Sequence, residues 1–217
     1  MIIIEVQTTE PFIFRKIEGF TKKVPKKLSD PQKHQRWESL GWSLPDICTE
    51  IKLVEGLILK HFPSTPCGFT HNDLLLENVV YNREKGSVNF IDFEYGCYSY
   101  LYFDIGNHFA EYAGVGEEDH SRYPDEAYQK WWLTIYLTEY HKLNSLSHIP
   151  ITEQLLLNTY NQVRVFSLAA YLFWGVWAFF QAEYSAVDFD YVAFAQSRLG
   201  AYFEKKEEFL APFTSAS

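Results

Sequence analysis

The chain has 217 residues and a formal net charge of −9, and 47% of its residues are hydrophobic. This composition is enough to build a packed core and excludes an intrinsically disordered protein. The negative charge argues against nucleic-acid binding, because the one short basic cluster, Lys22 to Lys27, is better explained as a solvated loop.

The first third of the chain predicts one long helix after an irregular start. Residues 1–30 contain Pro11, Gly19 and Pro25, which break any long element, so we expect a hinge segment that leads into a domain. Apolar residues at helical spacing predict a helix over residues 45–62. A short apolar approach, residues 68–70, then leads into a polar loop.

The rest of the chain predicts a hairpin followed by helices. Two short strands are expected at residues 79–81 and 88–91, with a loop over residues 92–100 after them. Helices are expected at residues 104–113, 125–142, 152–184 and 188–209. The predicted fold class is therefore α+β and predominantly helical. Its order of elements is that of a protein-kinase-like C-lobe, which we expect over residues 31–217.

Two features bear on the location of the chain. The stretch Val165–Ala182 has no charged residue and reaches the lower length limit for a membrane span. Its tryptophans lie near the middle rather than at the ends, so we predict a buried core helix and no membrane span. Cys48, Cys67 and Cys97 fit neither a disulfide framework nor a zinc pattern, which predicts a reducing, cytoplasmic location.

The segment from His71 to Asn78 fits the pattern H-x-D-x-x-x-x-N. In the kinase template the aspartate, here Asp73, accepts the proton of the substrate hydroxyl, and the asparagine, here Asn78, binds Mg²⁺. Asp92 follows the second predicted strand, where kinases display a second magnesium ligand. The alternative is that these three residues cap loops and have no chemical role.

Asp104, His108 and Glu111 are spaced so that they share one helix face. One interpretation is that Asp104 accepts hydrogen bonds from the catalytic-loop backbone and, with His71, supports that loop. Another is a metal site built from His71, His108 and Glu111, although no H-E-x-x-H pattern is present.

Four ordered motifs resemble the choline/ethanolamine kinase family: His71–Leu75, Ile91–Tyr95, Phe103–Phe109 and Phe173–Trp177. The resemblance covers residues 45–206. It implies an ATP-dependent phosphotransferase acting on the hydroxyl of ethanolamine or choline, with ATP as co-substrate and Mg²⁺ as cofactor. Such an enzyme catalyses the first step towards phosphatidylethanolamine or phosphatidylcholine.

The resemblance also implies a role for individual residues. Asp73 would be the base, Asn78 and Asp92 the magnesium ligands, and Glu111, Trp174, Trp177 and Tyr191 the surroundings of the ammonium group. A cation–π contact contributes about 0.5–2 kcal/mol, which suits such a pocket. Without the family, two tryptophans three residues apart would be more typical of a helix core.

The motifs divide between the two substrates of the family. Leu74-Leu75 and the run Phe109–Val115 are more similar to ethanolamine kinases. Tyr191 and Ala195-Gln196 are more similar to choline kinases, but Phe194 stands where many of those have a pocket tyrosine. We favour ethanolamine.

The chain departs from the family pattern before His71, where it has neither a Gly-rich loop nor a strand-borne lysine. We therefore expect the N-lobe to be absent and transfer by this chain to be impaired, because positioning and charge stabilisation supply nearly all phosphoryl-transfer catalysis. The alternative is a non-catalytic amine-binding or regulatory fragment that pairs with an intact kinase, and a homodimer is a further expectation. Another branch of the kinase fold, such as an aminoglycoside kinase, fits less well with Glu111 and the paired tryptophans.

Overall fold

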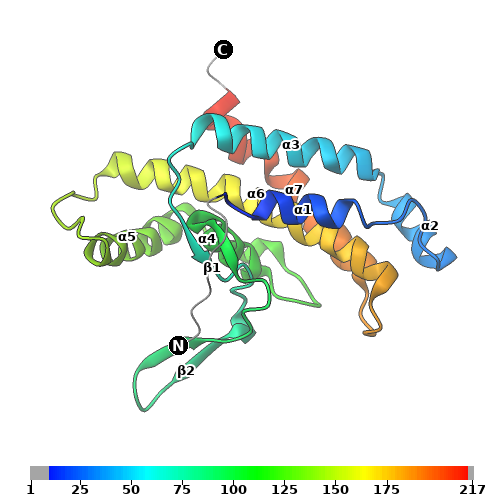
Figure 1. Cartoon of the computed structure of the whole chain (residues 1–217), viewed down its shortest axis with the longest axis horizontal. Helices are drawn as coiled ribbons and strands as arrows, with labels where there is room; N and C mark the ends of the chain where they lie inside the picture. Colours follow the sequence, from blue (N-terminus) through cyan, green and yellow to red (C-terminus); the bar gives the residue numbers. More distant parts are fainter. Residues whose placement is uncertain (1–9, 215–217) are drawn as a thin grey trace.

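The computed structural model describes residues 10–214 as a helical bundle with two small sheets beside it (Figure 1). The α-helices are α1 (Ile13–Thr21), α2 (Pro31–Ser39), α3 (Leu44–His61), α4 (Leu101–Ala110), α5 (Glu126–Leu143), α6 (Glu153–Tyr184) and α7 (Tyr191–Thr214). The strands are β1 (Cys67–Thr70), β2 (Val79–Asn82), β3 (Ser87–Phe90) and β4 (Cys97–Tyr100). Short 3₁₀ turns lie at η1 (Leu76–Asn78), η2 (Glu111–Ala113) and η3 (His120–Arg122). The predicted α+β class dominated by helices is confirmed.

Helix α6 forms the centre of the bundle (Figure 1), and every residue from Val163 to Val176 is buried. Helices α1, α3, α4, α5 and α7 all pack against it. By length and composition α6 could cross a membrane, but 89% of its most apolar window is buried inside the protein. The prediction of a core helix over Val165–Ala182 is confirmed.

Helix α4 lies unusually close to α6 at Gly106. A Cβ atom at this position would lie 2.7 Å from the backbone nitrogen of Ser167 and 2.9 Å from the carbonyl oxygen of Val163. The Ser167 hydroxyl donates a 3.0 Å hydrogen bond to the carbonyl oxygen of Gly106. This contact needs a residue without a side chain, and it fixes α4, which carries Asp104 and Asn107, against the helix that carries Trp174.

Local signals define α3 as predicted. The Ser43 and Asp46 side chains form a capping box, and Pro45 lies in the first turn, where a helix tolerates it. The residues whose spacing predicted the helix form its buried face: Ile47, Ile51, Val54 and Ile58. The predicted helices over residues 125–142 and 152–184 also agree with α5 and α6 to within one residue at each end.

The sheets are only partly as expected. The predicted hairpin is present as β2 and β3, which pair antiparallel with Val79 opposite Phe90. The segments expected as an irregular approach and a loop contain two further strands, β1 and β4, which pair antiparallel with Thr70 opposite Cys97. Four-residue strands from distant parts of the chain leave no local periodicity, which explains the error.

The first 40 residues were also misread, because α1 and α2 were not expected. Pro11 precedes α1 and Pro25 follows it, so the two prolines flank the helix, and Gly19 is tolerated in its last turn. Helix α1 buries Ile13, Phe14 and Ile17 in the same core as α3 and α6. Helix α2 buries only Trp37, so its periodic signal is weak. The four lysines of the Lys22 to Lys27 cluster are exposed after α1, as expected for a solvated loop.

Candidate active site

The loop between β1 and β2 is held by α4 through Asp104. The Asp104 carboxylate accepts hydrogen bonds from the backbone nitrogens of His71 (2.8 Å) and Asn72 (2.6 Å). Burial raises the pKa of Asp104, and the two backbone hydrogen bonds act in the opposite direction. These are the bonds that the bracing interpretation of Asp104 expected.

Asn72 turns the loop. Its φ of 65° lies in the left-handed region, where asparagine is tolerated better than most residues. Its side-chain amide nitrogen donates a 2.8 Å hydrogen bond to the backbone carbonyl oxygen of Tyr95. Its backbone carbonyl oxygen accepts a 3.3 Å hydrogen bond from the side-chain amide of Asn107. The loop before β2 and the loop before β4 are therefore fixed to each other.

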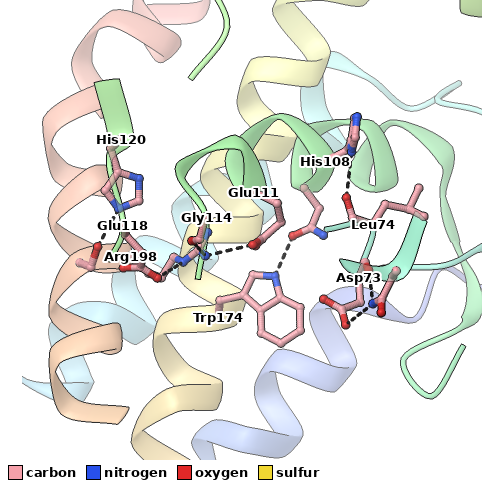
Figure 2. Close-up of polar contacts among 12 residues, drawn as sticks. Asp73, Leu74, His108, Glu111, Gly114, Glu118, His120, Trp174 and Arg198 are labelled. Carbon is pink, nitrogen blue, oxygen red and sulfur yellow. Dashed lines mark hydrogen bonds and ion pairs between the residues drawn. The ribbon is translucent and has the colours of Figure 1, made fainter. Parts of the chain in front are cut away.

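The carboxylate of Asp73 is buried, with only 8% of the residue exposed. The Asn78 amide donates to the Asp73 carboxylate at 3.1 Å and to its carbonyl oxygen at 2.9 Å (Figure 2). Burial, followed by the negative charge of Glu111 and smaller effects of Asp92 and Glu94, raises the pKa of Asp73 to about 7, although the bond from Asn78 opposes the shift. A carboxylate with a pKa near neutrality is suited to act as a general base at physiological pH.

Asn78 and Asp92 lie at neighbouring positions beside this carboxylate. The backbone nitrogen of Ile91 donates to the carbonyl oxygen of Asn78 at 3.1 Å, which puts Asp92 one residue beyond that bond. Asp92 has a φ of 61° and an exposed side chain. An amide oxygen and a carboxylate are the hard ligands that Mg²⁺ shares with phosphate oxygens, so the two residues fit this ion.

The alternative metal site of His71, His108 and Glu111 is not formed. His71 Nε2 lies 2.8 Å from the carbonyl oxygen of Ile91, and His108 Nδ1 lies 2.8 Å from that of Leu74. Both imidazoles therefore support loops. Within residues 10–214 no cluster of three or more His, Cys, Asp or Glu side chains could hold a metal ion.

A cavity of about 280 Å³ opens beside Asp73. It brings together the predicted base, Asp73, and the residues predicted to surround the ammonium group: Glu111, Trp174, Trp177 and Tyr191. The ring centroids of Trp174 and Trp177 are 5.3 Å apart, and those of Trp177 and Tyr191 are 5.7 Å apart. Aromatic faces and acids around one small cavity suit an organic cation.

Several cavity residues were not predicted. Tyr95 ends the motif Ile91–Tyr95, but the sequence predicted no role for its ring. The ring lines the cavity and contacts Trp174, with the two ring centroids 5.2 Å apart. Phe189 comes from the short connection between α6 and α7, where no motif marks it. Its position depends on how the two helices meet, which local sequence does not encode.

The largest omission is Arg198, which pairs with Glu111 at 3.0 Å and with Glu118 at 3.2 Å. Arg198 lies two helical turns after Tyr191, so the two residues share a face of α7. This spacing was the one feature of the sequence that could have placed Arg198 near the site. Burial raises the pKa of Glu111, while the charge of Arg198 and its hydrogen bond lower it. Glu111 therefore meets the cavity as half of an ion pair rather than as a free acid.

Comparison with known proteins identifies the family of the chain. The family profile described as choline/ethanolamine kinase matches residues 2–203. The chain belongs to the choline/ethanolamine kinase family. It is 43% identical over 202 residues to an ethanolamine kinase of Drosophila melanogaster, covering 93% of this chain and 38% of that protein. It is 37% identical over 210 residues to a probable ethanolamine kinase of Nematostella vectensis, covering 97% of this chain and 60% of that protein.

A solved structure supports the fold. The ethanolamine kinase of Plasmodium vivax superposes with a TM-score of 0.77 at 25% identity, covering 93% of this chain and 52% of that one. The kinase-like architecture predicted from the sequence is therefore confirmed. The chain spans between 38% and 60% of the length of these three relatives.

Proposed function

We propose that this site transfers the γ-phosphoryl group of ATP to the hydroxyl of ethanolamine, with choline as the second candidate substrate. One observation carries the proposal: the buried carboxylate of Asp73 lines the same small cavity as Glu111 and the two tryptophans. A base and a cation-binding pocket in one small cavity suit a short molecule that has an ammonium group at one end and a hydroxyl at the other. The relatives described as ethanolamine kinases favour ethanolamine.

In this mechanism the ammonium group lies against Trp174, Trp177 and Tyr191, near the negative charge of Glu111, and the hydroxyl points to Asp73. Asp73 accepts the hydroxyl proton as the substrate oxygen forms its bond to the γ-phosphorus. The bond from that phosphorus to the bridging oxygen of ATP breaks, and its electron pair leaves with ADP. Asn78 and Asp92 would hold Mg²⁺, which screens the phosphate charge.

The test is an ADP-release assay of the chain with Mg²⁺ and ATP, using ethanolamine and choline as acceptors. Turnover with either amine that is lost in Asp73→Asn supports the proposal. Turnover with a different alcohol, and with neither amine, would overturn the substrate assignment.

A second candidate is an amine-binding module without catalysis, alone or paired with an intact kinase. It is favoured by the cavity itself, because residues of this chain alone line it. Calorimetry separates the two candidates. Ethanolamine binding without turnover in any mixture of chain, ATP and Mg²⁺ would favour the second.

The proposed activity also bears on the metabolic role, the location and the oligomeric state of the protein. A kinase of this class supplies the phosphorylated head group from which phosphatidylethanolamine or phosphatidylcholine is made, and we propose that it acts in the cytoplasm. Size-exclusion chromatography with light scattering tests whether the chain forms a homodimer.

A further inference from the structure

A buried ion cluster lies behind the amine cavity (Figure 2). Arg198, on α7, has a fully buried side chain, and it bridges Glu111 and Glu118, whose side chains are 4% and 5% exposed. The distances are 3.0 Å from Arg198 Nη2 to Glu111 Oε2 and 3.2 Å from Arg198 Nε to Glu118 Oε1. One guanidinium facing two carboxylates leaves the cluster with a net charge of about −1 when all three are ionised.

The three residues occupy different positions relative to the cavity. Glu111 lines it, whereas Glu118 does not and lies on the other side of Arg198. Arg198 also donates a 3.3 Å hydrogen bond to the carbonyl oxygen of Gly114. It thereby ties down the loop whose Val115 forms part of the cavity wall.

Nearby titratable groups do not cancel this charge. Burial, followed by the charge of Arg198, lowers the pKa of His120 to about 4, so His120 is neutral at pH 7. Burial raises the pKa of Tyr171, whose phenol is also neutral. The other charged groups that act on Glu111 are acidic: Asp73, Glu77 and Glu118. Among the described residues, Arg198 is therefore the cation that pairs directly with Glu111.

A buried cluster with one uncompensated negative charge is costly without a counter-ion and is balanced by a monovalent cation in the adjoining cavity. We propose that Glu118 and Arg198 set the charge of the ion cluster beside the amine pocket at −1 and so help to make the pocket selective for an organic monocation over a neutral molecule of the same shape. Both act through Glu111, so they are positioning residues rather than catalytic ones. This inference deepens the proposed function, on which it rests for the identity of the site.

The deciding variant is Glu118→Gln, which removes the charge of a residue that does not line the cavity. A charge several ångströms from the ammonium group in a poorly solvated site contributes enough to weaken binding by roughly 5- to 30-fold when it is lost. Glu117→Gln is the matched control, because it removes the same charge from the preceding residue, whose side chain is exposed. We expect it to change affinity by less than about twofold, because exposed charges are screened.

Calorimetry at pH 7 would compare the wild type and both variants with ethanolamine and with tetramethylammonium, after a thermal melt has shown that each variant folds. Weaker binding of both cations by Glu118→Gln alone supports the inference. Equal affinities in Glu118→Gln and the wild type, or equal losses in both variants, would overturn it. Failure of the wild type to bind either cation would overturn it as well.

Two further measurements separate a charge effect from a structural one. The alcohol 3,3-dimethylbutan-1-ol is the neutral carbon analogue of choline, and it should bind Glu118→Gln as well as it binds the wild type. A distorted cavity would instead weaken the binding of this alcohol and of the two cations alike. Arg198→Lys keeps the positive charge of the cluster, so its cation affinity should stay close to that of the wild type if charge is what matters. A loss as large as in Glu118→Gln would contradict this. Cation binding that depends on Glu118, found together with an absence of phosphoryl transfer, would keep this inference and overturn the proposed kinase activity.

Discussion

The indole nitrogen of Trp174 donates a 2.7 Å hydrogen bond to the side-chain oxygen of Asn107 (Figure 2). The same amide donates from its nitrogen to the carbonyl oxygen of Asn72. A single buried asparagine on α4 therefore joins the wall of the amine cavity to the loop that presents Asp73. Both functions of the amide are used, so no other side chain of this size replaces it.

Replacing Asn107 by alanine should uncouple the two parts of the site. The change leaves the indole of Trp174 and the carbonyl of Asn72 without these partners, which costs about 2–4 kcal/mol in the free energy of unfolding. We expect denaturant unfolding to report this loss and calorimetry to report weaker ethanolamine binding. Asn89→Ala, at an exposed position on β3, should change the unfolding free energy by less than about 0.5 kcal/mol. Similar effects of both variants would contradict the assigned role of Asn107.

Gly106 provides a second test of how α4 is positioned. Gly106→Ala brings a methyl group to within 3 Å of the α6 backbone, which cannot move aside as a side chain can. We expect a loss of about 2–4 kcal/mol in unfolding free energy. The control is Gly200→Ala in α7, where an added Cβ meets nothing within 4 Å. Helix propensity predicts a gain of up to about 1 kcal/mol there. Opposite signs in the two urea titrations are the expected outcome, and a stable Gly106→Ala variant would disprove the close packing.

Elements with strong local signals were predictable from the sequence. The helices α3, α5 and α6 follow from apolar periodicity, and the pair Trp174 and Trp177 follows from helical spacing. The brace from Asp104 to the catalytic loop was one of the interpretations of the sequence, because acids clustered on one helix face need a partner.

The unpredicted parts depend on contacts between distant segments. Within residues 10–214, β1 and β4 pair only with each other, and neither is long enough to show an alternating pattern. Arg198 meets Glu111 only because α4 and α7 both pack on α6, and an isolated arginine in a helix carries no mark of a buried ion pair. Secondary structure could thus be inferred better than the electrostatics of the site.

If the proposed kinase activity is correct, Asp92 should separate catalysis from amine binding. Asp92 does not line the amine cavity, but it is a proposed ligand of Mg²⁺. Asp92→Asn should lower kcat by about 100-fold or more, because charge stabilisation dominates phosphoryl transfer. Ethanolamine affinity measured without Mg²⁺ should stay within about twofold of the wild type, because the lost charge is exposed and screened. An unchanged kcat, or an equal loss of amine affinity, would reject the metal role.

Asp73 should make stability depend on pH in an unusual direction. Its pKa is raised in the folded chain, to about 7, so the folded state binds the proton more tightly than the unfolded state does. Below about pH 4, the ordinary carboxyl pKa, Asp73 is protonated in both the folded and the unfolded state and does not destabilise the fold. Between pH 4 and pH 7 the unfolded state loses this proton first, so the fold becomes progressively less stable. The loss of stability is complete above about pH 7.

Asp73→Asn removes the buried charge, so this variant should be more stable than the wild type at pH 8 by about 2–4 kcal/mol, while the two should nearly coincide at pH 4. Guanidinium unfolding across this range measures the difference. Asp188→Asn, at an exposed loop position, removes the same charge and should change stability by less than about 0.5 kcal/mol. A gap between Asp73→Asn and the wild type that stays constant from pH 4 to pH 8 would show that the Asp73 carboxyl does not titrate as a base with a raised pKa, and it would remove the physical basis for its proposed role.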